Sequence, residues 1–251
     1  MGLDESTLKK LRTQIGALTA DGTGVILDAA TGAGETTAQL AAAMKEGKLI
    51  TVDQDAESWE KWAKPLLKAN GLLRQVEFHQ DNLRYLTSVE RGSCDLVVSH
   101  STLSAMGVWA IDAIRQFRRV LKPGGTLLIA DLLPENESEP QASNISALSW
   151  RLMKAAAHLA GQPHYEELPV EWVKARVQEA GFQIESVTIN PERPPASPTS
   201  FEEWRRANCG SNIEDPSLCE AFRATWRLYV ERAENEGLTN KEGSYTLWAR
   251  A

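Results

Sequence analysis

Four short apolar runs of this sequence each end in side chains that can bind a ligand. The polar residues at or just past these ends are Asp28, Asp53, Asp81 with Asn82, and Ser99 with His100. In an open α/β sheet, ligands bind at the carboxyl ends of the strands. If the four runs are neighbouring parallel strands, these side chains surround one crevice.

The first run leads into a glycine loop. Val25 to Ala30 reads as a buried strand, Gly32 and Gly34 follow it, and Glu35–Ala43 has helix-forming composition. Glycine at these positions allows a sharp reversal and lets a ligand approach a backbone that has no side chain. We expect Asp28 to point its carboxylate into the crevice beside this loop.

The loop disfavours a nicotinamide cofactor, although a nicotinamide-dependent oxidoreductase of similar topology is a rival interpretation. The G-x-G-x-x-G fingerprint requires a third glycine, and Thr37 stands at that position. The strand Lys48–Val52 instead ends in Asp53, about 20 residues past the loop, where an acid can hold both hydroxyls of a ribose.

At this point the chain resembles the class I S-adenosylmethionine (SAM)-dependent methyltransferases, over roughly residues 20 to 132. The resemblance rests on the glycine loop, Asp53, Asp81, the strand Cys94–Val98 and the run Arg119–Ile129 with its Pro-Gly-Gly turn. That last run is similar to the branch containing ubiquinone and menaquinone C-methyltransferases and many small-molecule enzymes. One departure is Ala30, where the family usually has a glycine. Because alanine is small, we expect a slightly tighter site.

The resemblance implies SAM as the cofactor and assigns its contacts. The cofactor-binding residues would be Asp28, Ala30, Thr31, Gly32, Gly34, Asp53, Gln54, Asp81, Asn82 and Ser99. The loop would take the amino-acid end of SAM, and Asp53 would take the ribose. Asp81 would accept the adenine amino group while the Asn82 backbone donates to a ring nitrogen. An acid at that place has little structural purpose otherwise.

The acceptor half of the site is harder to predict. His100 lies where the family places the methionine end and the acceptor, and it is our candidate catalytic base. Alternatively, it only shapes the pocket or bonds to the backbone. The candidate substrate contacts are Thr102, His158, His164, Tyr165 and Trp204, with surface or packing roles as the alternative. His158 and His164 lack further converging ligands, so we predict no metal site.

The resemblance also sets the predicted fold: an α/β, Rossmann-like, seven-stranded, mostly parallel sheet with an antiparallel last strand and helices on both faces. Val108, Ile111, Ile114, Phe117 and Leu121 mark the apolar face of one helix. We expect a single domain over residues 1–251, with helical cap segments at 133–168, after strand 5, and at 191–243, between strands 6 and 7.

Composition narrows the class of partner. The 251 residues carry a net charge of −7, which argues against nucleic-acid binding because such proteins present a basic face. Cys94, Cys209 and Cys219 form no C-x-x-C pair and indicate reduced thiols in a cytoplasmic protein. No apolar run approaches membrane-spanning length, so we expect no membrane partner. A homodimer interface is one open explanation of the aromatic residues in segment 191–243.

These observations predict a methyltransferase that acts on an O, N or C atom of a small molecule. A SAM-binding regulatory or partner subunit without methyl transfer is the main alternative. A methyltransferase acting on a protein also stays open, because an acidic enzyme can dock a basic protein.

Overall fold

The chain divides into two compact units in a computed structural model that describes residues 3, 5–134, 152, 154–161, 166–193, 213–236 and 242–251. The first unit contains Met1–Asp131, Leu168–Thr188 and Tyr245–Ala251, and the second contains Leu132–Glu167 and Ile189–Ser244. The two segments of the second unit begin and end close to the cap segments expected from the sequence. The single-domain interpretation itself stays a prediction.

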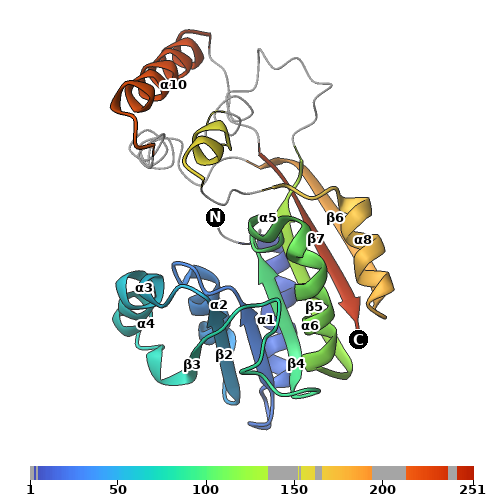
Figure 1. The fold of residues 1–251 in the computed structure, drawn as a ribbon. Coiled ribbons are helices and arrows are strands. Elements are labelled where there is room, and N and C mark those ends of the chain that lie inside the picture. The colour runs from blue at the N-terminus through green and yellow to red at the C-terminus, as the bar shows by residue number, and fades with distance from the viewer. Residues whose placement is uncertain are drawn as a thin grey trace. The chain divides into compact units, whose positions relative to one another are not determined.

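The strands form one seven-stranded sheet, as predicted (Figure 1). They are β1 (Val25–Ala29), β2 (Lys48–Asp53), β3 (Val76–Gln80), β4 (Cys94–His100), β5 (Leu121–Leu132), β6 (Gln183–Arg193) and β7 (Glu242–Arg250). Their order is β3-β2-β1-β4-β5-β7-β6. The pairs from β3 to β5 are parallel, whereas Gly125 bonds to Ala251 and Leu133 to Gly243, so β7 runs antiparallel to β5.

The order of the strands reverses between β1 and β4, which lie side by side although β2 and β3 come between them in sequence. Ala29 is paired with Val52 on one side and with Ser99 on the other. The carboxyl ends of these strands are therefore level. The chain leaves β1 and β4 in opposite directions, and this divergence opens a crevice where doubly wound sheets bind ligands.

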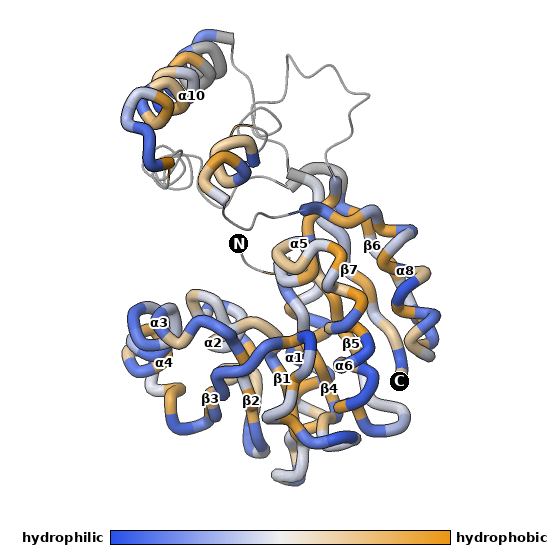
Figure 2. Tube along the Cα trace, viewed as in Figure 1, coloured by the Kyte–Doolittle hydropathy of each residue, from blue (hydrophilic) through white to orange (hydrophobic). Residues whose placement is uncertain are grey.

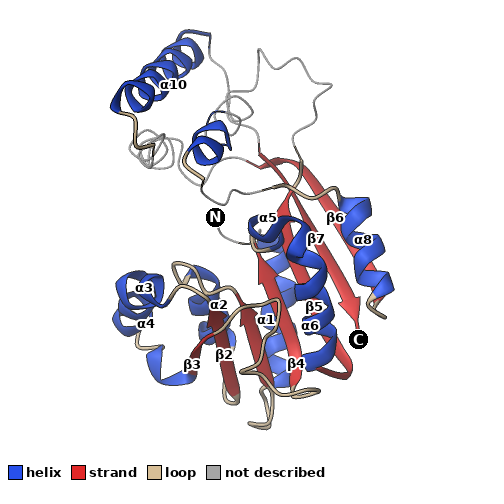
Figure 3. Cartoon of the chain, viewed as in Figure 1, coloured by secondary structure: helices blue, strands red, loops and turns tan. Residues whose placement is uncertain are grey.

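Helices connect the strands along the chain (Figure 3). They are α1 (Glu5–Leu18), α2 (Glu35–Ala43), α3 (Ala56–Ser58), α4 (Lys64–Ala69), α5 (Leu103–Met106), α6 (Ala110–Val120), α8 (Val170–Glu179) and α10 (Pro216–Glu236). A π-helical turn, Trp59–Ala63, joins α3 to α4. Pro65 follows this turn and has no backbone N–H to donate, which accounts for the irregular helix.

One hydrophobic core cluster of the first unit lies between the sheet and α1 and α2. Leu8, Leu11 and Ile15 of α1 and Leu40 of α2 pack with the strand side chains Ile26, Leu49, Leu96, Val98 and Leu128. In Figure 2 the inner strands are largely hydrophobic, whereas blue, hydrophilic residues lie along the helices. On β1, Ile26 and Asp28 are two residues apart and therefore share this helix-covered face.

The apolar face of α6 differs from the predicted one. The helix begins at Ala110, and its buried side chains are Ala110, Ala113, Ile114, Phe117 and Val120. Val108 precedes the helix in a short 3₁₀ turn and is 64% exposed. The prediction had the correct period but extended it over a segment that is not part of the helix.

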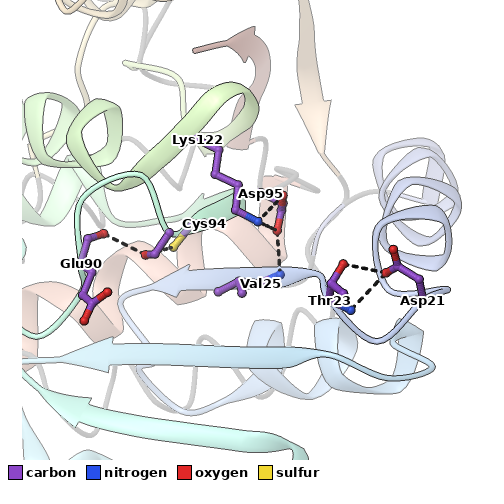
Figure 4. A network of polar contacts seen from close by, with 8 residues as sticks. Asp21, Thr23, Val25, Glu90, Cys94, Asp95 and Lys122 are labelled. Atoms are coloured by element: carbon purple, nitrogen blue, oxygen red, sulfur yellow. Dashed lines mark hydrogen bonds and ion pairs between the residues drawn. The ribbon is translucent and has the colours of Figure 1, made fainter.

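A network of polar contacts closes the amino edge of the sheet (Figure 4). Lys122 Nζ donates to both carboxylate oxygens of Asp95, at 2.8 and 2.7 Å, and Asp95 Oδ2 also accepts from the Val25 N–H at 2.9 Å. Nearby, the Asp21 carboxylate accepts from the backbone N–H and hydroxyl of Thr23. These carboxylates hold the strand starts in place.

Candidate functional site

The loop between β1 and α2 is held tightly at one end and open in the middle. Ala30 and Thr31 both donate their backbone N–H to the Val52 carbonyl at 3.0 Å. A Cβ atom on Gly34 would lie 2.7 Å from that of Ala63, so this glycine is needed for packing. A Cβ on Gly32 would meet nothing within 4 Å. The backbone at Gly32 therefore faces open space that a ligand can use.

Ala30 adopts a backbone conformation that favours glycine. Its φ is 76°, in the left-handed region where L-residues other than glycine are strained by roughly 1–2 kcal/mol. Ser101, at the end of β4, has a φ of 52°. Strained residues of this kind concentrate at functional sites. Alanine at position 30 therefore raises the energy of the backbone. From the sequence we expected only a slightly tighter site, because alanine is larger than glycine.

Asp28 lies inside the protein instead of facing the crevice. It is 1% exposed, and its Oδ2 accepts from Thr37 Oγ1 at 2.5 Å and Thr51 Oγ1 at 3.3 Å. Burial raises the pKa of Asp28 to about 7, against the lowering effect of the two hydroxyls. The expected orientation is wrong because Asp28 shares its strand face with Ile26, which packs under α2.

Asp53 connects the end of β2 to the glycine loop. Its Oδ2 accepts the Gly32 N–H at 2.8 Å, and its Oδ1 accepts the Asp55 N–H at 3.0 Å. The side chain is partly exposed, so its remaining lone pairs can accept hydroxyl groups from a ligand. The structure thus brings together two residues that are 21 positions apart, and the contact of Asp53 with a ribose stays a prediction.

Asp81 has a structural task that the sequence analysis did not foresee. Its Oδ2 accepts from the Ser88 N–H at 2.6 Å and from Thr87 Oγ1 at 3.1 Å, and its Oδ1 accepts the Asn82 N–H. Burial raises the pKa of this carboxyl, but the hydrogen bonds from Ser88, Asn82 and Thr87 outweigh burial and the net pKa is lowered. Asp81 therefore stays ionised and fixes the loop after β3.

Asn82 and Gln54 lie beside Asp81 and Asp53. Asn82 Nδ2 donates to Gln54 Oε1 at 3.4 Å, and Asn82 Oδ1 accepts the Arg84 N–H at 2.9 Å. The Asp81 N–H in turn bonds to the Asp53 carbonyl. The ends of β2 and β3, to which the resemblance assigns ribose and adenine, are thus linked by direct hydrogen bonds.

His100 lies at the end of β4 and faces α2. Its Nδ1 is 2.9 Å from Thr36 Oγ1, a residue of the first turn of α2 that the sequence analysis missed. Ser99 is fully buried, and its hydroxyl has no hydrogen-bond partner among the described residues. An unpaired buried hydroxyl at the strand end is the kind of group that a bound ligand or water satisfies.

Thr102 has a structural role at the same edge. It is 2% exposed, and its hydroxyl lies 3.0 Å from the carbonyl oxygens of both Ala29 and His100. It thereby ties the end of β1 to the end of β4. Its contact with a substrate stays a prediction, and its burial favours the packing alternative.

A second buried polar group, absent from the sequence-based site, lies where β5 and β7 meet α5. Asp131 accepts the Ser104 N–H at 3.1 Å and the Ser104 hydroxyl at 2.6 Å. The register of β5 with β7 places Tyr245 opposite Asp131, so their side chains share a face. Burial, and then the charge of Asp131, raise the pKa of Tyr245. Asp131 lies one residue before the end of β5, much as Asp53 ends β2, and this position is a signal that could have identified it.

The other candidate substrate residues fall in the second unit or outside the described residues. His158 is exposed, and residues 154–159 are helical. His164, Tyr165 and Trp204 lie outside the described part of the chain. Across the described ranges, no three His, Cys, Asp or Glu side chains gather as a metal site would require. No helix in those ranges is long and apolar enough to span a membrane.

The chain is similar to methyltransferases in sequence and fold. A methyltransferase-domain family matches residues 26–125. The chain is 31% identical over 114 residues to the ubiquinone/menaquinone biosynthesis C-methyltransferase UbiE of Syntrophotalea carbinolica. The aligned segment covers 44% of each protein. It is 27% identical over 237 residues to the probable methyltransferase ltbC of Aspergillus luteorubrus, covering 90% of this chain and 78% of that protein.

A crystal structure of a candidate methyltransferase from Bacillus halodurans aligns with a TM-score of 0.64 over 98% of both chains, at 22% identity. That likeness concerns the fold. The chain matches less than half the length of the UbiE protein. The family match, residues 26–125, runs from β1 into β5.

Proposed function

We propose that the chain is a class I SAM-dependent methyltransferase, and that it moves a methyl group from SAM to an oxygen, nitrogen or carbon atom of a small-molecule acceptor. The small-molecule acceptor is supported by the acidic net charge, which disfavours nucleic acid, and by the similarity to an enzyme named for quinones. The observation that carries the proposal is the hydrogen bond between Asp53 and Gly32, which joins the acid that would bind the ribose to the open glycine loop.

The described residues fit this cofactor. The space beside Gly32 leaves room for the ligand, and the first turn of α2 has no side-chain cap on its backbone N–H groups. Such N–H groups favour a carboxylate. Asp53 would accept the ribose hydroxyls, and Asp81 and Asn82 would hold the adenine. Thr31 and the loop backbone would contact the amino-acid end.

The reaction asks for alignment more than for a reactive side chain. When bound, SAM supplies a methyl group already activated by the positive sulfur. The protein holds the acceptor atom in line with that group and excludes water, an orientation effect worth roughly 7–11 kcal/mol. The Thr102 hydroxyl and the Ser101 N–H fix the end of β4 by bonding to the Ala29 and Ala130 carbonyls, and the Thr36 hydroxyl fixes the ring of His100. His100 would take the proton released when the acceptor is a hydroxyl or amine, which adds about 10²- to 10⁴-fold.

Transfer of labelled methyl groups tests this function. The full chain is incubated with methyl-labelled SAM and a panel containing quinols, phenols, small amines and a basic protein. Label on a small molecule, reduced about 100-fold in His100→Gln when the acceptor is a hydroxyl, is the expected result. Label on the basic protein alone would establish the protein-directed alternative. SAM binding without transfer to any acceptor would favour the regulatory subunit instead.

A further inference from the structure

Four buried polar side chains below the glycine loop form one connected series of hydrogen bonds. Asp28 accepts from Thr37 and Thr51, and Thr51 Oγ1 lies 2.6 Å from Thr31 Oγ1. None of the four residues is more than 4% exposed. We propose that Asp28, Thr51 and Thr31 form a hydroxyl relay, in which an ammonium group bound at the loop causes Asp28 to lose its proton to solvent. This inference rests on the proposed function.

The relay follows from counting protons. Each threonine hydroxyl has one proton to donate. When Asp28 is ionised, Thr37 and Thr51 both donate to it, so Thr51 can only accept from Thr31. The Thr31 proton then points inward, and its oxygen presents lone pairs toward the loop. When Asp28 is protonated, its O–H can donate to Thr51. The Thr51 hydroxyl then donates to Thr31, and the Thr31 proton turns outward.

The two arrangements suit different ligand groups. An ammonium donates hydrogen bonds, so it pairs with the lone pairs that Thr31 presents when Asp28 is ionised. If the Thr31 proton pointed outward, two hydrogen-bond donors, the hydroxyl and the ammonium, would face each other and could not pair. Thr31 adjoins Gly32, where the structure leaves open space. A cofactor with an amino-acid end supplies an ammonium, and Thr31, Thr51 and Asp28 then act as positioning residues for it.

The proton is available near neutral pH. Burial raises the pKa of Asp28 to about 7, and the charge of Asp53 contributes to the increase. The charged or titratable groups on the elements packed against Asp28 are Glu35 on α2, Lys48 and Asp53 on β2, and Cys94, Asp95 and His100 on β4. Of these, Asp53 acts on the pKa of Asp28. About half of the molecules therefore carry the proton at about pH 7 in the absence of ligand.

Calorimetric titration in buffers of different ionisation enthalpy counts the protons released on binding. The probe is S-adenosylhomocysteine (SAH), titrated into the full chain from about pH 6 to about pH 8. We expect release of roughly half a proton per SAH at about pH 7, and a Kd that weakens by up to about tenfold per pH unit below it. The control probe, 5′-methylthioadenosine, lacks the amino-acid end and should release none.

Two variants of Thr51 separate the relay from other titrating groups. Thr51→Ser keeps the hydroxyl and should keep the proton release. Thr51→Val keeps the shape but removes the hydroxyl, and it should abolish the release. The pair Thr31→Ser and Thr31→Val repeats the comparison at the other end of the relay should either Thr51 variant fail to fold.

The outcomes distinguish the relay from the proposed function. SAH binding without proton release by the wild type would overturn the relay and leave the function intact. Release that persists in the valine variants would assign the proton to another group, such as His100, and would also overturn the relay. Absence of SAH binding at every pH would overturn the proposed function and the relay together.

Discussion

Asp28 and Asp95 are carboxylates on neighbouring strands, but the protein treats them differently. Asp95, at the amino edge of the sheet, pairs with Lys122 and accepts the Val25 N–H (Figure 4). Asp28, near the carboxyl edge, is almost fully buried and has hydroxyl groups as partners, and its pKa is raised to about 7. At the amino edge, Lys122 neutralises the charge of Asp95. Near the carboxyl edge, the protonation of Asp28 can change around neutral pH.

The carboxyl edge also contains the backbone strain and unpaired groups of the site. Ala30 and Ser101 have left-handed backbone conformations there, and the Ser99 hydroxyl lacks a partner among the described residues. Such features cost stability and persist where function requires them. The comparison therefore favours the carboxyl edge as the place where a ligand binds, because the protein leaves polar groups there incompletely satisfied.

The largest expected effect concerns stability and pH. The folded-state pKa of Asp28 is raised from 3.8 to about 7. The contribution of Asp28 to the free energy of unfolding is therefore fully present below about pH 4 and is lost as the pH rises through 7. At about 1.4 kcal/mol per pH unit, that loss is roughly 4 kcal/mol. Asp28→Asn cannot titrate, so its free energy of unfolding should lack this decrease. Urea unfolding across pH measures it, and parallel curves for both proteins would contradict the account.

A smaller effect is expected at Asp131, a carboxylate of the carboxyl edge that is well satisfied. Asp131→Ala leaves the buried hydroxyl and N–H of Ser104 without their acceptor, which should lower the free energy of unfolding by about 2–3 kcal/mol. Ser104→Ala is the matched control and should cost about 1 kcal/mol, because it removes one of the two bonds. Equal losses in the two variants would show that the Asp131 carboxylate is not needed by the Ser104 N–H.

Asp95→Ala tests the structural role of the amino edge of the sheet. We expect a loss of about 1 kcal/mol in the free energy of unfolding, because Lys122 is 40% exposed and solvent screens its ion pair. The affinity for SAH should not change, since Asp95 lies at the opposite edge from the loop. Chemical denaturation and calorimetric titration measure the two quantities, and a weakened SAH affinity in a folded variant would contradict the separation of the edges.

The smallest effect is expected at Ala30. Ala30→Gly removes the left-handed strain but gives the unfolded chain more freedom, so the net gain in the free energy of unfolding should be about 0.5–1 kcal/mol. Ala33→Gly is a comparison variant in the same loop without a positive φ, and it should destabilise. A loss of stability in Ala30→Gly would show that the loop is not strained.

The fold could be predicted because it depends on local patterns, whereas binding of a cofactor at the carboxyl edge stays a prediction. Apolar runs followed by acids marked the strands, and Asp53 does reach the glycine loop. The direction of Asp28 was missed because a strand alternates its side chains between two faces, and the sequence does not say which face α2 covers. Thr36, Thr51 and Tyr245 were missed because their partners come from other elements of the fold.

The acceptor half could not be predicted for a physical reason. Methyl transfer needs a shaped, water-free space more than a particular reactive group, so no short motif marks its residues. Val108 illustrates the same limit, because it has the helical period of α6 but lies in the turn before the helix. Asp81 was predicted only to bind a ligand, but its carboxylate also stabilises the loop after β3 by accepting the Ser88 N–H.

SAH titration into the wild type, Asp53→Ala and Asp95→Ala tests the central claim, that the carboxyl edge binds SAM while the amino edge serves the fold. Each substitution removes one carboxylate, and the two sites lie at opposite edges of the same sheet. The account predicts binding by the wild type, at least about tenfold weaker binding by Asp53→Ala, and unchanged binding by Asp95→Ala, on the scale of a charge-assisted hydrogen bond. No binding by the wild type, or equal weakening in both variants, would contradict it.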